Sequence, residues 1–198
     1  MYDKAVEGKA IGKPRCKHLI CFFPFQDPSM LNGWDNFFIM TGTAGATLTG
    51  LLFVVITLCI RLSTTRAAYG VHAFVTPTLV HFGGVLFQSL ALLVPWPSAW
   101  PLGIILGLTG LAGLAYVIVV VRMLRRLDFV SLDLRDWIAY AGAPALANAS
   151  LIAGAAGLIA GDSFAPYAVT GAITLLLFVG IHDAWDLTLW IIRNQDIK

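Results

Sequence analysis

The chain has 198 residues, of which 58% are hydrophobic and 12% are charged. A soluble domain usually carries about twice that charged fraction, so the composition excludes a soluble globular protein and indicates an integral membrane protein. The formal net charge of only +2 and the scattered basic residues argue against nucleic acid as a partner.

The chain opens with a polar extension, residues 1–33, that contains every lysine but the last. Its apolar stretch, 19–25, is short, is broken by Pro24 and is followed by no small-residue cleavage site, so it does not resemble a signal peptide. We expect a disordered or surface-lying segment, or else residues from an upstream start ahead of a natural start at Met30.

The three cysteines, Cys16, Cys21 and Cys59, are too few and too unevenly spaced for a disulfide framework. Together with His18, the first two supply three ligands that zinc accepts, but the spacing matches no standard site and a fourth ligand is missing. We therefore expect reduced thiols, no metal site and no bound cofactor.

Residues 34–198 contain five apolar segments long enough to cross a bilayer as helices, since about 20 residues suffice at a rise of 1.5 Å each. We expect one all-α transmembrane domain, with a short loop over 62–70 and a charged amphipathic connector over 127–136. The expected spans are about 36–60, 72–94, 102–121, 137–160 and 166–192.

Small residues recur at intervals of four in the first and fourth segments, which places them on one helix face and favours close helix contacts. The residues concerned are Gly42, Ala46 and Gly50, and then Ala145, Ala149, Ala153 and Gly157. Glycines at 103, 107, 110 and 113 predict a further packing surface, and we assign that third helix a structural role. In the fourth segment we expect Pro144 to kink the helix and Asn148 to bond a neighbouring helix.

Ionisable side chains within the spans concentrate in the second and fifth segments. His81 and Gln88 are seven residues apart and share a helix face, while His182, Asp183 and Asp186 interrupt the fifth apolar run. Such groups are costly in hydrocarbon and often mark ion or proton paths. If the two helices touch, we expect these five side chains to line one cytoplasm-facing cavity that binds a proton or ion, with Gln88 as an orienting partner.

Two other interpretations of these polar residues remain open. Trp185 and Trp190 are typical of a membrane interface, so the His182–Asp186 stretch is also consistent with a helix end that has reached the surface. Two histidines on facing helices could hold a haem, but His72 and His81 lie on opposite sides of one helix. No catalytic set stands out, which favours a protein that is not an enzyme.

Basic residues near the spans lie in the first and third loops and at the C-terminus, whereas the second and fourth loops have none. By the positive-inside rule this places the C-terminus in the cytoplasm and the N-terminus outside. The residues are Arg61, Arg66, Arg122, Arg125, Arg126, Arg135, Arg193 and Lys198.

The run Trp34-Asp-Asn-Phe-Phe38, followed by Gly42 to Val54, resembles the opening of small multi-pass bacterial membrane proteins to which no activity is attached. The resemblance covers mainly the first span. It implies a bacterial inner membrane and a start near Met30, and it carries no functional residue over to this chain.

We therefore expect a small channel, transporter or proton-coupled module in the inner membrane. The alternative is a non-catalytic accessory or assembly subunit of a membrane complex, and a third reading is a haem- or metal-binding redox protein. The expected partners are the lipid bilayer and either further copies of the chain or another membrane protein, because five helices leave little room for a conduit within one monomer.

Overall fold

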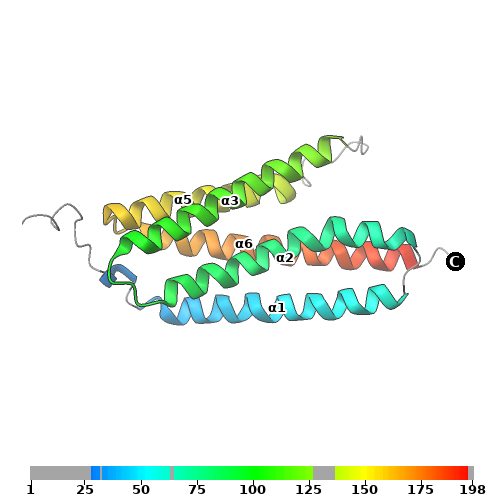
Figure 1. Ribbon diagram of the computed structural model, residues 1–198, viewed down its shortest axis with the longest axis horizontal. Helices are drawn as coiled ribbons and strands as arrows, with labels where there is room; N and C mark the ends of the chain where they lie inside the picture. The colour runs from blue at the N-terminus through cyan, green and yellow to red at the C-terminus, as the bar shows by residue number, and fades with distance from the viewer. Residues whose placement is uncertain (1–27, 32, 63–64, 127–136, 196–198) are drawn as a thin grey trace, which may run out of the picture.

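The computed structural model describes residues 28–31, 33–62, 65–126 and 137–195. Within these ranges the chain is helical and contains no strand, which confirms an all-α bundle. The elements are η1 (Pro28–Leu31), α1 (Asp35–Leu62), α2 (Thr65–Leu93), α3 (Ala99–Arg126), η2 (Ile138–Gly142), α5 (Ala143–Ala160) and α6 (Ala165–Gln195) (Figure 1).

Five helical stretches are long and apolar enough to cross a membrane, as the sequence predicts. They are Asp35–Thr57, Val75–Leu93, Ala99–Arg122, Ile138–Ala160 and Ala165–Leu189. The expected loop over 62–70 is wrong, because α1 continues to Leu62 and α2 already begins at Thr65. Hydropathy marks where the hydrocarbon ends, whereas good helix formers such as Arg66 and Ala67 extend the helix beyond that point.

The helices form a row in which each packs on the next, in the order α1, α2, α6, α5 and α3. Figure 1 shows α3 and α5 as one pair along the upper side, α2 and α6 in the middle and α1 along the lower side. Of the five spans, those of α2 and α6 have the largest buried share, so a polar residue is best shielded from lipid in these two helices, which we call the central helices.

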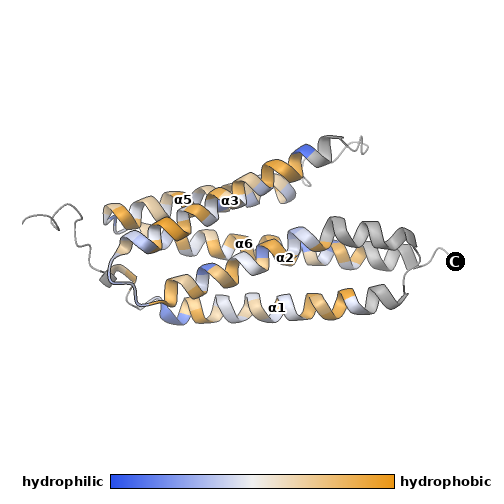
Figure 2. Ribbon diagram, viewed as in Figure 1, coloured by the Kyte–Doolittle hydropathy of each residue, from blue (hydrophilic) through white to orange (hydrophobic). Residues whose placement is uncertain are grey.

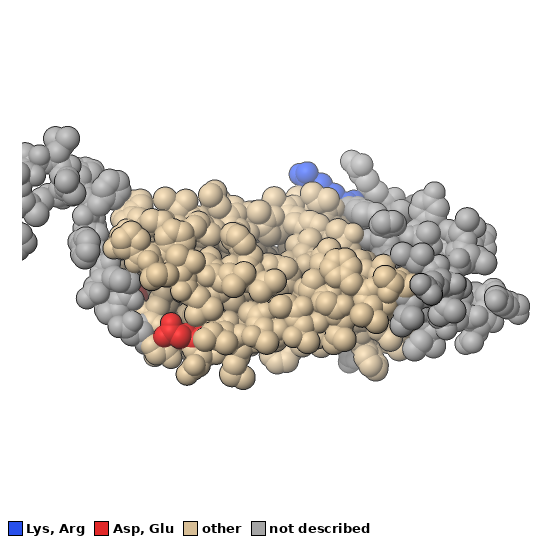
Figure 3. All heavy atoms as spheres, turned by 60° about the horizontal axis from the view of Figure 1, so that its bottom comes forward, with Lys and Arg blue, Asp and Glu red and all other residues tan. Residues whose placement is uncertain are grey.

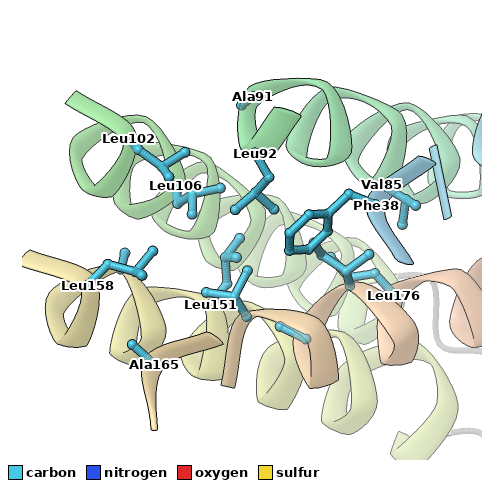
Figure 4. Packing of buried hydrophobic residues seen from close by; sticks show 14 of the residues in the cluster. Phe38, Val85, Ala91, Leu92, Leu102, Leu106, Leu151, Leu158, Ala165 and Leu176 are labelled. Atoms are coloured by element: carbon cyan, nitrogen blue, oxygen red, sulfur yellow. The ribbon is translucent and has the colours of Figure 1, made fainter. Parts of the chain in front are cut away.

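The apolar core joins all five long helices at the end where α2 connects to α3. Leu92, Leu106 and Leu151 reach toward Phe38 of α1, and all four are buried (Figure 4). Many large apolar side chains instead point outward, on α1 and α3 above all. In Figure 2 these helices carry hydrophobic residues around their outer faces, as expected for a surface in contact with lipid tails.

Charged side chains are confined to the two ends of the described surface in the view of Figure 3. Acidic side chains lie toward one end and basic side chains toward the other, and the tan band between them on this face is uncharged. An uncharged band with exposed large apolar side chains is expected of a multi-pass membrane protein.

The glycines of α3 pack against α5, which confirms that this helix has a close-packing surface. A Cβ atom built on Gly110 would lie 3.1 Å from the carbonyl oxygen of Asn148, and one on Gly103 would lie 3.1 Å from that of Ala155. One on Gly113 would overlap the Asn148 side chain. The α3–α5 contact therefore depends on glycine at several positions along its length.

The packing face of α1 differs from the expected one. Gly42 does face α2, since its Cβ would lie 3.0 Å from Cβ of Ser89, but Ala46 and Gly50 are exposed. The close contact runs instead through Gly45, whose Cβ would lie 3.0 Å from the Phe82 carbonyl oxygen. The large residues of α1, chiefly Phe38, determine which face is buried. Ala46 and Gly50, which follow Gly42 at intervals of four, point away from that face.

The expected ladder on α5 is likewise corrected. Ala149 and Ala153 are exposed, Ala145 is half-buried, and only Gly157 makes a close contact, with Ala165. The buried residues of α5 are Pro144, Ala147, Asn148, Leu151, Gly154, Ala155 and Leu158. Because α5 lies between α3 and α6, its leucines determine which faces turn inward, and the alanines at 145, 149 and 153 are left at the outer edge.

The expected kink at Pro144 takes the form of a π-helical turn. In η2 the backbone N–H of Ala143 donates to the carbonyl of Ile138, five residues earlier. Proline has no N–H for the carbonyl four residues before it, so a wider turn ahead of Pro144 reduces the mismatch. Nδ2 of Asn148 donates to the Pro144 carbonyl at 2.8 Å. Asn148 thus bonds its own helix rather than a neighbouring one, which corrects the prediction for this residue.

Several sequence predictions lie outside the described residues. They include most of the extension over 1–33, the cysteines at 16 and 21, and the connector over 127–136. The side chain of His72 is also outside them.

Candidate functional site

A histidine and an aspartate form a buried pair between α2 and α6. Nδ1 of His81 lies 2.9 Å from Oδ2 of Asp183, and the two residues are only 7% and 3% exposed. Gly180, one turn before Asp183, allows the helices to approach: a Cβ there would lie 2.6 Å from the Phe82 ring and 3.3 Å from Cβ of His81. The pair thus occupies the contact between the two central helices of the row.

The pair lies well inside the apolar part of both helices. Among the described side chains, the apolar stretch of α2 begins at Val75, about 9 Å of helix before His81, and that of α6 reaches Leu189, about 9 Å after Asp183. With a hydrocarbon core of about 30 Å, both groups lie in the same half of the membrane.

One oxygen atom of the Asp183 carboxylate has a hydrogen-bond partner, and the other has none among the described residues. Oδ2 contacts His81, while Oδ1 is buried and has no hydrogen-bond partner in the described part of the chain. Tyr116 of α3 is half-buried and interacts electrostatically with the same carboxylate. A buried carboxylate is stable in hydrocarbon only if it is neutralised, and a neighbouring imidazole or an added proton accomplishes this.

A second polar cluster lies on another side of α6 and nearer the end of its apolar span. Nδ1 of His182 lies 3.4 Å from Oδ2 of Asp186, one helical turn later, and the Tyr140 hydroxyl donates a hydrogen bond to the same oxygen. The Tyr140 and His182 rings meet edge to face at 6.0 Å. With side chains 49% and 27% exposed, His182 and Asp186 are open to their surroundings in a way that His81 and Asp183 are not.

The five predicted site residues therefore do not line one cavity. Asp183 and Asp186 are three positions apart, which turns them about 60° from each other around α6. Because α2 and η2 pack on different sides of α6, that angle directs Asp183 to His81 and Asp186 to Tyr140. The structure replaces the single expected site with a buried pair and a half-open cluster.

Gln88 is buried but is not the expected orienting partner of His81. Seven residues of α2, or about 10.5 Å of helix, separate the two. Its Oε1 atom has no hydrogen-bond partner among the described residues. The adjacent Ser89 bonds Thr41 of α1 at 3.0 Å, which links α2 to α1.

Two tyrosines belong to the site that the sequence does not single out. Tyr116 is the one ionisable residue of the third apolar segment. This residue is a signal in the sequence, but the prediction of a structural role for that helix does not use it. The π turn ahead of Pro144 brings Tyr140 to Asp186, and the hydropathy of the sequence does not predict such a turn.

Among the residues that the structure describes, no three His, Cys, Asp or Glu side chains are grouped so as to hold a metal ion. Comparison of the chain with protein-family models, with curated proteins and with solved structures finds no match.

Proposed function

We propose that this protein is a small proton-coupled transport module whose proton-binding site is the His81–Asp183 pair. The observation that carries the proposal is the burial of this pair inside the apolar spans of two packed helices. An ionisable pair in that position is costly to keep for packing alone, and such pairs are characteristic of proton relays and transporters. An imidazole beside a carboxylate can hold a proton or pass it on, which is what a proton site requires.

The half-open cluster of His182, Asp186 and Tyr140 supports the same function from the membrane edge. Asp186 lies about 4.5 Å of helix before Leu189, the last described residue of its apolar stretch, and about one helical turn from Asp183. Carboxylate, imidazole and phenol can each accept and release a proton there. The cluster would supply protons to the buried pair from the side that the positive-inside rule assigns to the cytoplasm.

The competing function is that of an accessory subunit. Ala46 and Gly50 of α1 and Ala149 and Ala153 of α5 are exposed, so small residues suited to helix contact remain on two outer faces. In that case the buried pair would hold α2 to α6, and the protein would co-purify with a stoichiometric membrane partner.

Proton flux in proteoliposomes tests the proposal, with a pH-sensitive dye inside the vesicles and both signs of membrane potential. We expect flux in the wild type and its loss in Asp183→Asn and His81→Gln, each shown to be folded by its thermal transition. The matched control is Ser89→Ala, which removes a buried polar contact of α2 that is not ionisable. Absence of wild-type flux, or equal loss in Ser89→Ala, would reject a proton site and favour the accessory subunit.

A further inference from the structure

Two buried side-chain oxygen atoms, one on α2 and one on α6, accept no hydrogen bond from the described residues. They are Oε1 of Gln88 and Oδ1 of Asp183, in side chains that are each 3% exposed. A buried acceptor without a donor is unfavourable, so such atoms in native proteins are usually bonded to an internal water molecule or a ligand. Both atoms belong to the interior bounded by the central helices.

The stretch of α2 between the two acceptors carries a glycine where a side chain would otherwise stand. Gly84 lies three residues after His81 and four before Gln88, so it is on their side of the helix. A Cβ built on Gly84 would meet a single atom within 4 Å, Nε2 of Gln88 at 4.0 Å. Gly84 thus has open space beside it, at a level of α2 between His81 and Gln88.

A further polar group lies on α3, where Tyr116 is half-buried. α3 packs mainly on α5 and follows α2 through the short connection 94–98. Figure 1 shows α3 diverging from α2 away from that connection. A hydroxyl on α3 and two free acceptors on α6 and α2 are the donors and acceptors that water requires.

We propose that a file of hydrogen-bonded water molecules lies over Gly84 and joins Oδ1 of Asp183 to Gln88. His81 and Gln88 are about 10.5 Å apart along the helix, a length that roughly four hydrogen bonds through about three water molecules cover. Gln88 in turn lies about 7.5 Å of helix from Leu93, the end of the apolar span on the opposite side. The file extends the site from one half of the membrane into the other.

The role of the file rests on the proposed function. A proton that reaches Asp183 from the Asp186 side neutralises its carboxylate, and Asp183 then releases one proton to the first water of the file. Each water accepts one proton and donates one to the next, so one proton moves and no covalent product remains. Gln88 accepts a hydrogen bond from the last water and holds it near the far side.

Cysteine accessibility tests the file without reference to transport. In a chain whose native cysteines are replaced by serine, Gly84→Cys is compared with Gly83→Cys, because a Cβ at Gly83 also meets no atom within 4 Å but lies about 100° away around the helix. The probe is a small, membrane-impermeant methanethiosulfonate ammonium reagent, applied to reconstituted protein and read by mass spectrometry. We expect position 84 to react at least tenfold faster than position 83, with equal reaction in denaturant. Equal slow rates in the folded protein would overturn the file.

A second measurement uses the unmodified protein, so it tests the file even if the cysteine variant does not fold. X-ray radiolysis generates hydroxyl radicals from ordered water in place, and these modify the side chains beside it. We expect modification of His81 and Tyr116 and little at Phe38 of α1, which is also buried but packs in the apolar core. Modification of Phe38 above His81 would overturn the file. If position 84 reacts but the wild type carries no proton flux, the file stands and the proposed function is rejected. If flux is observed but position 84 does not react, only the file is rejected.

Discussion

Nδ1 of His81 and Oδ2 of Asp183 lie 2.9 Å apart across the α2–α6 contact, although 102 residues separate them in the chain. Both helices are apolar on either side of the pair, and the side chains are almost completely shielded. Any change in the charge of one partner must therefore be felt by the other, and by the packing of the two central helices. On the proposed function, proton binding at this pair would therefore be coupled to the packing of α2 on α6.

The first prediction concerns the coupling energy of that pair. In a double-mutant cycle with His81→Ala and Asp183→Ala, we expect an interaction free energy of about 0.6–2 kcal/mol, as for other interhelical hydrogen bonds in membrane proteins. The measurement is reversible unfolding in mixed micelles. The matched cycle, His182→Ala with Asp186→Ala, should give less than about 0.5 kcal/mol because that pair is half-exposed and one turn apart on a single helix. Equal values would contradict the distinction between the buried pair and the half-open cluster.

The second prediction concerns glycine at the α5–α6 contact. A Cβ at Gly154 would lie 2.7 Å from Cγ2 and 3.1 Å from the backbone nitrogen of Val169, so Gly154→Ala should destabilise the fold by about 1–3 kcal/mol. Gly171 of α6 has no atom within 4 Å of such a Cβ, so Gly171→Ala should be neutral or stabilising by up to about 1 kcal/mol. Thermal unfolding of the two variants side by side is the measurement. A stable Gly154→Ala protein would mean that the helices are farther apart than the structure has them.

The positions of the five spans could be predicted from the sequence because hydrophobicity decides them, and it is a property of each segment alone. The sequence also indicates that His81 needs a polar partner, but it leaves open whether the second and fifth helices touch. The partner's identity was partly accessible for the same reason: Asp183 was one of three candidates on the fifth span.

The registers of Ala46, Gly50, Ala149 and Ala153 could not be predicted, because small residues at intervals of four permit a contact without requiring one. Which face turns inward is decided by large residues, such as Phe38 and Leu151, and by neighbours that belong to other parts of the chain. The separation of Asp183 from Asp186 has a similar origin. A difference of about 60° around α6 matters only once α2 and η2 are placed on different sides of it.

The third prediction concerns Tyr140 and the supply of protons to the buried pair. Tyr140→Phe removes the donor to Asp186 and keeps the ring that contacts His182. Because Asp186 is partly exposed, water replaces the lost donor, and the free energy of unfolding should fall by less than about 1 kcal/mol. Proton flux should fall by less than about tenfold, which corresponds to about 1.4 kcal/mol in the barrier, and by less than in Asp183→Asn.

The control for this experiment is Tyr167→Phe, because Tyr167 is an exposed tyrosine near the start of α6, at the opposite end of the helix, where its ring meets Trp34. We expect unchanged flux in that variant. Equal loss in the two tyrosine variants would show that the half-open cluster has no specific part in proton supply.

The fourth prediction concerns orientation. A fluorescent protein that matures only in the cytoplasm, fused after Lys198 in a bacterial host, should fluoresce, and alkaline phosphatase fused at the same point should be inactive. Fusion of either reporter after Ser98, between α2 and α3, should give the opposite result. The physical reason is the arginines beside the ends of α1 and α3, together with the absence of basic residues between α2 and α3. Replacing Arg122, Arg125 and Arg126 by glutamine should raise the phosphatase activity of the C-terminal fusion. A phosphatase-active C-terminal fusion of the wild type would reverse the assignment, and the half-open cluster would then take its protons from outside the cell.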